Sequence, residues 1–181
     1  MLRSATRAQG IHVKRRRFGP LPREVSVIGQ GTWQIEEGAA PPQSPPCAAQ
    51  EITGEGVLVC DQVLYHLKER AIEHAVLPWC EQHGLAVTAY SPFGHGDFPG
   101  PDTSGGRLLA EIARAHDAAP RQVALAFLTR RPSVSAIPKA SSVEHVEENA
   151  GASDVQMSPD EIEQIDAAFP RGPRPRELPM I

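Results

Sequence analysis

The stretch HGLAVTAYSPFGHG, residues 83–96, holds a helix stop, a strand and a glycine-rich turn in one run. Gly84 follows a segment with helical spacing and is predicted to end that helix, because glycine readily adopts the left-handed backbone of a helix C-terminus. Residues 85–90 are apolar and predict a buried strand. The strand stops at Ser91 and Pro92. The glycines that follow fit either a plain turn or a loop that lets a ligand approach the backbone.

Similar units lie on both sides of this stretch. Pro120 is predicted to be the first residue of a helix, Ser141 and Glu144 to form a capping box, and Ser158 and Glu161 to form another. Alternating strands and helices with short apolar strands are typical of a parallel α/β sheet. The predicted strands are 25–28, 57–64, 85–90 and 134–137, and the predicted helices are 69–83, 107–118, 121–131, one from Ser141 and one from Ser158.

Composition excludes some classes of protein. The chain has 181 residues and a net charge of -4, which gives no reason to expect nucleic acid as a partner. It contains no apolar run of membrane-spanning length. Three cysteines without paired spacing indicate a reducing compartment, so we expect a cytoplasmic protein. Cys80 and His83 are half of a metal motif without a second half, so no metal site is predicted.

Four zones divide the chain. Residues 1–22 are basic and are predicted to be a disordered arm. Residues 23–35 contain a first strand and its rim loop. Residues 36–56 include four prolines and show no helical or strand period, which predicts a linker. Residues 57–181 carry the regular strand and helix pattern.

Three loops are predicted to follow the carboxyl ends of parallel strands, where such sheets place their functional groups. They are residues 29–31, 91–94 and 138–141. In the last loop Lys139, two serine hydroxyls and a helix N-terminus converge, an arrangement that suits a phosphate or another anion. A capped surface helix with a solvated lysine is the alternative. His145, Glu148 and Asn149, further along this helix, could reach an attached ring or sugar.

Two polar or aromatic side chains belong to predicted strands. Gln62 would need a partner if buried, either an amide-bearing ligand or its own neighbours. Tyr90 ends its strand and is either a core residue, the commoner case, or a platform for a flat ring.

Together these stretches resemble the aldo-keto reductase family. The resemblance rests on VSVIGQGTW, on DQVLYHLKERAIEHAVLPWCEQHGLAVTAYSPFGHG and on PRQVALAFLTRRPSVSAIPKASSVEHVEENAGA. These segments are similar to the first strand and to the sixth, seventh and eighth strand–helix units of that family. The resemblance covers residues 23–35 and 57–170, and its AYSP and IPKA…EEN motifs are fairly specific in this order and separation.

The resemblance implies a TIM (β/α)8 barrel that binds NADP(H) and reduces aldehydes and ketones, so the expected partners are a nicotinamide dinucleotide and a small carbonyl substrate. His145 stands where many members carry an arginine, and a neutral imidazole holds phosphate less well, which weakens the expected preference for NADP over NAD. By position, the nicotinamide would be bordered by Gly31, Thr32 and Trp33. Gln62 would hold its carboxamide, and Tyr90 would stack on it. The pyrophosphate would be lined by Ser91, Pro92, Phe93 and Gly94, and the adenosine 2′-phosphate end would be held by Lys139, Ala140, Ser141, Glu148 and Asn149.

The catalytic residues of the family have no counterpart in the sequence. The family uses a tyrosine as general acid, with a lysine, an aspartate and a histidine on strands two to four. Those strands would fall between Trp33 and Gln62, where this chain has only the proline-rich linker. We therefore predict no catalytic residue, and enzymatic activity is left open.

An eight-unit barrel takes about 250 residues, so the resemblance implies an incomplete barrel built from strands one, six, seven and eight. Such a sheet would have unpaired edges and an apolar inner face, which favour self-association. The predicted function is that of an NADP(H)-dependent oxidoreductase family member that is inactive by itself. A non-catalytic dinucleotide-binding or interaction module, or a truncated gene product, is the alternative.

Overall fold

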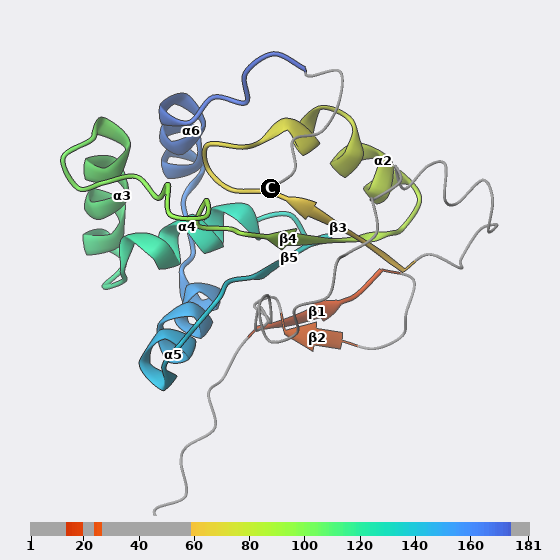
Figure 1. Cartoon of the computed structure of the whole chain (residues 1–181), viewed down its shortest axis with the longest axis horizontal. Coiled ribbons are helices and arrows are strands. Elements are labelled where there is room, and N and C mark those ends of the chain that lie inside the picture. Colours follow the sequence, from red (N-terminus) through yellow and green to blue (C-terminus); the bar gives the residue numbers. More distant parts are fainter. Residues whose placement is uncertain (1–13, 20–23, 27–58, 175–181) are drawn as a thin grey trace, which may run out of the picture.

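The computed structural model describes residues 14–19, 24–26 and 59–174, and a parallel sheet forms its centre (Figure 1). The strands are β3 (Cys60–Leu64), β4 (Ala86–Tyr90) and β5 (Val134–Ile137), in the order β3-β4-β5. Both pairings are parallel, with Val63 opposite Ala89 and Ala89 opposite Ala136. The predicted parallel α/β sheet is therefore confirmed for three of its strands.

One face of the sheet is covered by helices, and the core lies there. Val87 and Ala89 of β4 and Val134 and Ala136 of β5 are fully buried, because alternate residues of a strand point to the same face. Helix α4 (Pro120–Leu128) packs against β5 and lies between the sheet and α3 (Ser104–Ala115). Its residues 123–128 are all buried, as expected of a helix with neighbours on several sides.

Two further helices complete this cover, α5 (Val143–Gly151) and α6 (Pro159–Ala168), with the short η2 (Ala152–Asp154) between them. The predicted start of α6 is confirmed: Ser158 accepts a hydrogen bond from the Glu161 amide, and Glu161 reaches back to the Ser158 amide. Pro120 is the first residue of α4, also as predicted. Among the described residues, no helix combines the length and apolar character needed to cross a membrane.

The predicted helix 69–83 is in fact two elements, η1 (Ala71–His74) and α2 (Val76–Gln82). Pro78 gives the physical reason. In a continuous helix its missing N–H would break a hydrogen bond to residue 74, but in α2 it lies in the first turn, where the N–H groups need no helical partner. The end at Gly84 is confirmed, with φ +70° and a hydrogen bond from the Leu85 amide to the Cys80 carbonyl of 2.8 Å.

The N-terminal predictions need correction. Arg15–Arg17, inside the predicted disordered arm, form strand β1, and Glu24–Ser26 form β2, which pairs antiparallel with β1 instead of joining the parallel sheet. Segments this close in sequence pair as a hairpin, since parallel pairing needs a long crossover. The Arg16 guanidinium donates hydrogen bonds to the Thr129 and Arg131 carbonyls, a contact that charge patterning alone does not reveal. The linker 36–56 lies outside the described residues.

Candidate functional site at the carboxyl edge of the sheet

The ends of the three parallel strands are in register. Leu64 lies opposite Tyr90, and Tyr90 lies opposite Ile137, so the loops that follow all begin at the same edge. The backbone amide of Tyr65 also bonds the Tyr90 carbonyl, at 3.4 Å. Two of the three predicted rim loops are thereby brought together, residues 91–94 and 138–141. Gly31, Thr32 and Trp33 of the third lie outside the described residues.

The loop after β4 is a tightly curled chain. Ser91, Gly94, His95 and Gly96 all have positive φ, and the Gly94 amide bonds the Ser91 carbonyl at 2.8 Å. Gly94 is also buried against the His66 ring: a Cβ on Gly94 would lie 3.3 Å from that ring. The glycine is therefore needed both for its backbone conformation and for a close approach.

His66 and its neighbours hold this loop from the side of β3. Burial lowers the pKa of His66 below its ordinary value, although the charges of Glu69 and Asp97 oppose this shift. The ring serves as a packing surface for Gly94. Lys68 forms an ion pair with Asp97 at 2.7 Å, which connects the segment after β3 to the loop after β4 at the surface. Nothing in the sequence singled out His66 or Lys68 for this contact.

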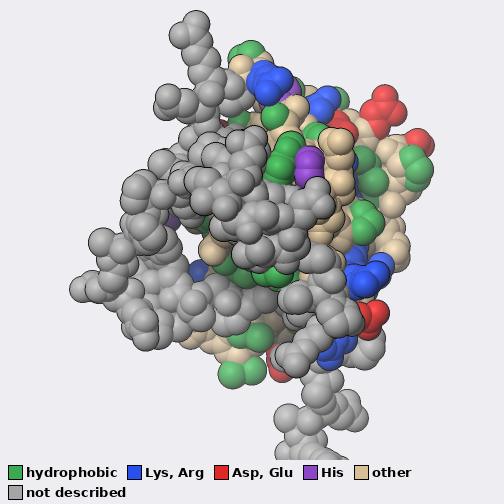
Figure 2. All heavy atoms as spheres, turned by 90° about the vertical axis from the view of Figure 1, so that its right-hand side faces the viewer, with side chains coloured by type: hydrophobic (Ala, Val, Ile, Leu, Met, Phe, Trp, Pro, Cys, Tyr) green, Lys and Arg blue, Asp and Glu red, His purple; other side chains and the backbone are tan. Residues whose placement is uncertain are grey.

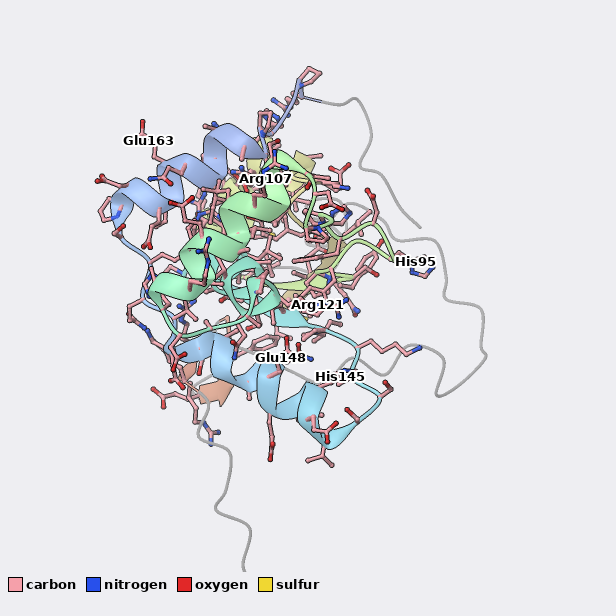
Figure 3. The ribbon with its side chains drawn as sticks, turned by 90° about the vertical axis from the view of Figure 1, so that its left-hand side faces the viewer. His95, Arg107, Arg121, His145, Glu148 and Glu163 are labelled. Carbon is pink, nitrogen blue, oxygen red and sulfur yellow. The ribbon has the colours of Figure 1, made fainter. Side chains whose placement is uncertain are left out.

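Aromatic rings connect the same loop to α4. Phe93 and Phe98 meet edge to face, with ring centroids 5.8 Å apart. The Arg121 guanidinium lies over both rings, 5.0 Å from the Phe93 centroid and 5.5 Å from that of Phe98. An arginine over aromatic faces is attracted by their electron-rich surfaces. Arg121, exposed at the start of α4, thus contacts this loop, and the sequence did not indicate that contact (Figure 3).

The N-terminus of α5 opens from the loop after β5. Its cap is Ser142, whose hydroxyl accepts from the His145 amide at 3.2 Å, so the predicted capping box of Ser141 and Glu144 is wrong by one position. Both serines suit the cap chemically, and only the path of the chain out of β5 selects between them. His145 projects from the first turn of α5 (Figure 3). Lys139, Ala140 and Ser141 precede the cap, and Lys139 is exposed.

Gln122 joins α4 to α5. Its side chain accepts from the Ala119 amide at 2.7 Å and donates to the Glu148 carbonyl at 2.8 Å. Glu148 is half-buried, whereas Asn149 is buried within the fold. The predicted residues of α5 thus lie at different depths, with His145 outermost. A glutamine three residues after the helix cap is the sequence signal that could have identified Gln122.

The face of the sheet opposite the core carries the remaining predicted residues. Gln62 is exposed and lies beside Thr88 in register, and Tyr90 is half-buried two residues further along β4. Because alternate residues share a face, Gln62 and Tyr90 point to the same side of the sheet. Tyr90 is therefore half-buried on this face, and its role as a platform for a flat ring stays a prediction.

Tyr65, the other tyrosine of the chain, belongs to a buried ionic network. Its hydroxyl donates to the Glu73 carboxylate at 2.6 Å and accepts from Arg130 at 3.1 Å. Burial raises the pKa of Tyr65 well above its ordinary value, and the Arg130 charge only partly opposes this. Arg70 holds both carboxylate oxygens of Glu73, each at 2.8 Å. Tyr65 is fully buried and faces away from solvent.

On the face shown in Figure 2, basic and acidic side chains of the described residues are interspersed with hydrophobic ones. No group of three or more histidine, cysteine, aspartate or glutamate side chains within residues 14–19, 24–26 and 59–174 is arranged to hold a metal ion. Cys80 is buried, and His83 instead stacks on Trp79 and contacts its carbonyl.

Comparison with known proteins identifies relatives of this chain. The chain is 36% identical over 131 residues to methylglyoxal reductase YeaE of Escherichia coli, which is 72% of this chain and 46% of that protein. It is 34% identical over 88 residues to 9,11-endoperoxide prostaglandin H2 reductase of Trypanosoma cruzi, 49% of this chain and 30% of that protein. It thus spans less than half the length of either relative.

A solved structure is also similar to this chain. An aldo-keto reductase of Klebsiella pneumoniae in complex with NADPH matches with a TM-score of 0.61 and 40% identity, over 68% of this chain and 43% of that one. The sequence model of the aldo/keto reductase family matches residues 43–169, which is most of the chain. With its parallel sheet and helical cover, the chain belongs to the aldo/keto reductase family.

Proposed function

We propose that this chain binds NADP(H) along the carboxyl edge of β3, β4 and β5. The observation that carries the proposal is the alignment of Leu64, Tyr90 and Ile137, from which the two motif loops start side by side. The Klebsiella pneumoniae relative with NADPH bound supports it. A cofactor that spans several strand ends would contact both loops, as ligands do in parallel α/β proteins.

The individual roles follow from the position of each residue. Lys139, Ser141 and the capped N-terminus of α5 form the phosphate end of the site, where a cation and helix N–H groups would face the adenosine phosphate. His145, Glu148 and Asn149 would contact the adenosine. The curled loop of Ser91, Pro92, Phe93 and Gly94 would follow the pyrophosphate. Gln62 and Tyr90, on the open face of the sheet, would meet the nicotinamide.

Turnover is a separate matter. Carbonyl reduction needs a proton donor within hydrogen-bond reach of the carbonyl oxygen. Tyr65 does not meet this need, since its hydroxyl is buried and bonded to Glu73 and Arg130. We therefore infer that the chain binds the cofactor without reducing carbonyl compounds by itself. The family activity on small aldehydes and ketones would then need groups that the described residues do not supply.

The binding proposal is tested by titrating NADPH fluorescence with the chain. We expect saturable binding that Lys139→Gln weakens at least about tenfold, because hydrogen bonds to a charged phosphate contribute roughly 1.5–3 kcal/mol. Arg107→Gln is the matched control, since it removes one positive charge from the exposed surface of α3 (Figure 3). A flat titration, or equal losses in the two variants, would refute the proposal.

The inference about turnover is tested with methylglyoxal, a substrate named for the Escherichia coli relative. We expect the NADPH absorbance to remain at the rate of the protein-free blank while the binding titration stays positive. NADPH consumption above the blank, stoichiometric with loss of methylglyoxal, would show that a proton donor is present. The two measurements separate loss of binding from loss of chemistry.

A second candidate function is self-association through the sheet. Among the described residues β3 and β5 each pair with one strand only, so each has an edge with backbone groups available for pairing. Light scattering across a concentration series would show a dimer if this proposal holds. A monomer at all concentrations would exclude it without bearing on cofactor binding.

A further inference from the structure

A cavity of about 210 Å³ lies away from the carboxyl edge of the sheet, between β1, the end of α4, η2 and the start of α6. Its walls combine three cationic side chains with polar and apolar groups. The lining residues are Lys14, Arg16, Ala126, Thr129, Arg130, Ala152, Ser153, Val155, Gln156, Met157 and Ile162. None of these residues takes part in the proposed cofactor site.

Arg16 is the central feature of the cavity. Its Nη1 donates to the Thr129 carbonyl at 2.6 Å and to the Arg131 carbonyl at 2.9 Å, which orients the guanidinium at the end of α4. Partial burial lowers the pKa of Arg16 below its ordinary value. No carboxylate among residues 14–19, 24–26 and 59–174 forms an ion pair with it. Within the described part of the chain this half-buried cation is held by neutral carbonyls, an environment that favours an anion as its further partner.

The alternation of β1 turns one cation toward the cavity. Arg16 is half-buried there, whereas Arg15 and Arg17 point to the other face of the strand and are exposed. Lys14 precedes the strand and also lines the cavity, but it is exposed. Ser153 is buried in the cavity wall, and its Oγ accepts from the Lys14 backbone amide at 3.2 Å. This contact uses the oxygen lone pair and leaves the hydroxyl proton to donate to a ligand.

Part of the cavity wall is apolar. Met157 and Ile162 are half-buried and pack against the core, and Ala126 and Ala152 are buried beside them. Inorganic phosphate would leave this wall in contact with water. A carboxylate with a short alkyl body would match both the Arg16 guanidinium and the apolar lining. Its planar head matches the donors of an arginine, and its alkyl body removes apolar surface from water.

We propose that this cavity binds a small monocarboxylate, with the carboxylate on Arg16 and Ser153 and a short alkyl chain against Met157 and Ile162. The site is separate from the cofactor edge. Arg16 contacts carbonyls just before β5 begins, whereas Lys139 and the α5 cap follow the end of that strand. The two sites thus lie at opposite ends of β5 and can be occupied together.

The test is a titration of the full chain with butyrate, followed by amide chemical shifts in ¹H–¹⁵N spectra at low ionic strength. We expect saturable shifts at Ser153 and Gln156 that persist with saturating NADPH. Butyramide has a similar shape without the charge, and inorganic phosphate has the charge without the alkyl body, so we expect both to bind at least about tenfold more weakly.

Variants assign the site. Arg16→Gln should weaken butyrate binding about tenfold, and Ser153→Ala about threefold. Arg17→Gln is the matched control: it removes the same charge from the same strand on the opposite face, and its affinity should stay within about twofold of the unaltered chain. Arg16 also contacts two carbonyls, so Arg16→Gln can disturb folding. In that case Ser153→Ala still tests the site.

Several results would overturn the proposal. One is the lack of saturation by butyrate, and another is an equal response to butyramide or to phosphate. Displacement by NADPH would assign the shifts to the cofactor edge. Equal losses in Arg16→Gln and Arg17→Gln would show general attraction to a basic strand.

Discussion

The network around Glu73 and the loop after β4 both use paired charges, but in opposite surroundings. The Arg70 and Glu73 side chains are 2% and 4% exposed, whereas Lys68 and Asp97 are 39% and 71% exposed. Breaking a buried pair leaves a charge without water, while an exposed pair is screened and contributes little. We therefore expect substitutions in the buried network to act mainly on stability, and substitutions in the exposed loop to act mainly on the proposed cofactor binding.

Removing the charge of Glu73 should give the largest effect. Arg70, Arg130 and the Tyr65 hydroxyl all meet this carboxylate, so Glu73→Gln removes the buried negative charge that balances two cations and leaves Arg70 with Asp166 as its remaining ion-pair partner. We expect a loss of about 3–5 kcal/mol in the free energy of unfolding, measured by urea denaturation. Glu163→Gln, on the exposed surface of α6, should change stability by less than about 0.5 kcal/mol. Similar losses of stability in the two variants would contradict the difference between the buried and the exposed charges.

The same carboxylate predicts a pH dependence. Burial would raise the pKa of Glu73, but hydrogen bonds from Arg70 and Tyr65 and the charges of Arg70 and Arg130 lower it from 4.5 to about 2. Because the pKa falls on folding, this contribution to stability is present above pH 4.5 and is lost as the pH falls toward 2. Glu73→Gln should flatten the stability profile in that window.

Gly94→Ala tests the loop, with an effect of intermediate size. A left-handed residue with a side chain costs about 1–2 kcal/mol, and the new Cβ would also crowd the His66 ring. Gly96→Ala is a matched control, since Gly96 also has positive φ but, apart from its chain neighbours, no heavy atom of the described residues lies within 4 Å of its Cβ position. We expect both variants to lose stability in thermal unfolding. Only Gly94→Ala should also weaken NADPH binding. An equal loss of NADPH affinity in both variants would count against the proposed contact between Gly94 and the cofactor.

The smallest effect expected is that of the helix caps. Ser142→Ala and Ser158→Ala each remove a hydroxyl that accepts a backbone N–H, so each should cost about 1 kcal/mol. Their effects on NADPH affinity should differ, since only Ser142 lies at the carboxyl edge of the sheet. If Ser158→Ala weakens NADPH binding as much, the proposed phosphate end is wrong.

Local patterns predicted those elements that depend on neighbouring residues. The strands ending at Leu64, Tyr90 and Ile137, the stop at Gly84 and the capping box at Ser158 were all readable, because each rests on a short-range period or on a turn. The break at Ala75 follows from Pro78, which the helical spacing of residues 69–83 did not take into account. The choice of Ser142 over Ser141 was not readable, since it depends on the path of the chain out of β5. The roles of the site residues remain proposals.

Sequence alone determined the three parallel strands and the two motif loops at their carboxyl ends, because apolar period and turn residues are local properties. The family followed from the resemblance of the quoted motifs to known members. Tertiary structure decided which distant groups meet: Arg121 over Phe93, Gln122 on the Glu148 carbonyl, and Arg16 at the end of α4. It also turned a basic run into a strand of a hairpin. Such contacts join residues far apart in the chain, and no short-range pattern encodes them.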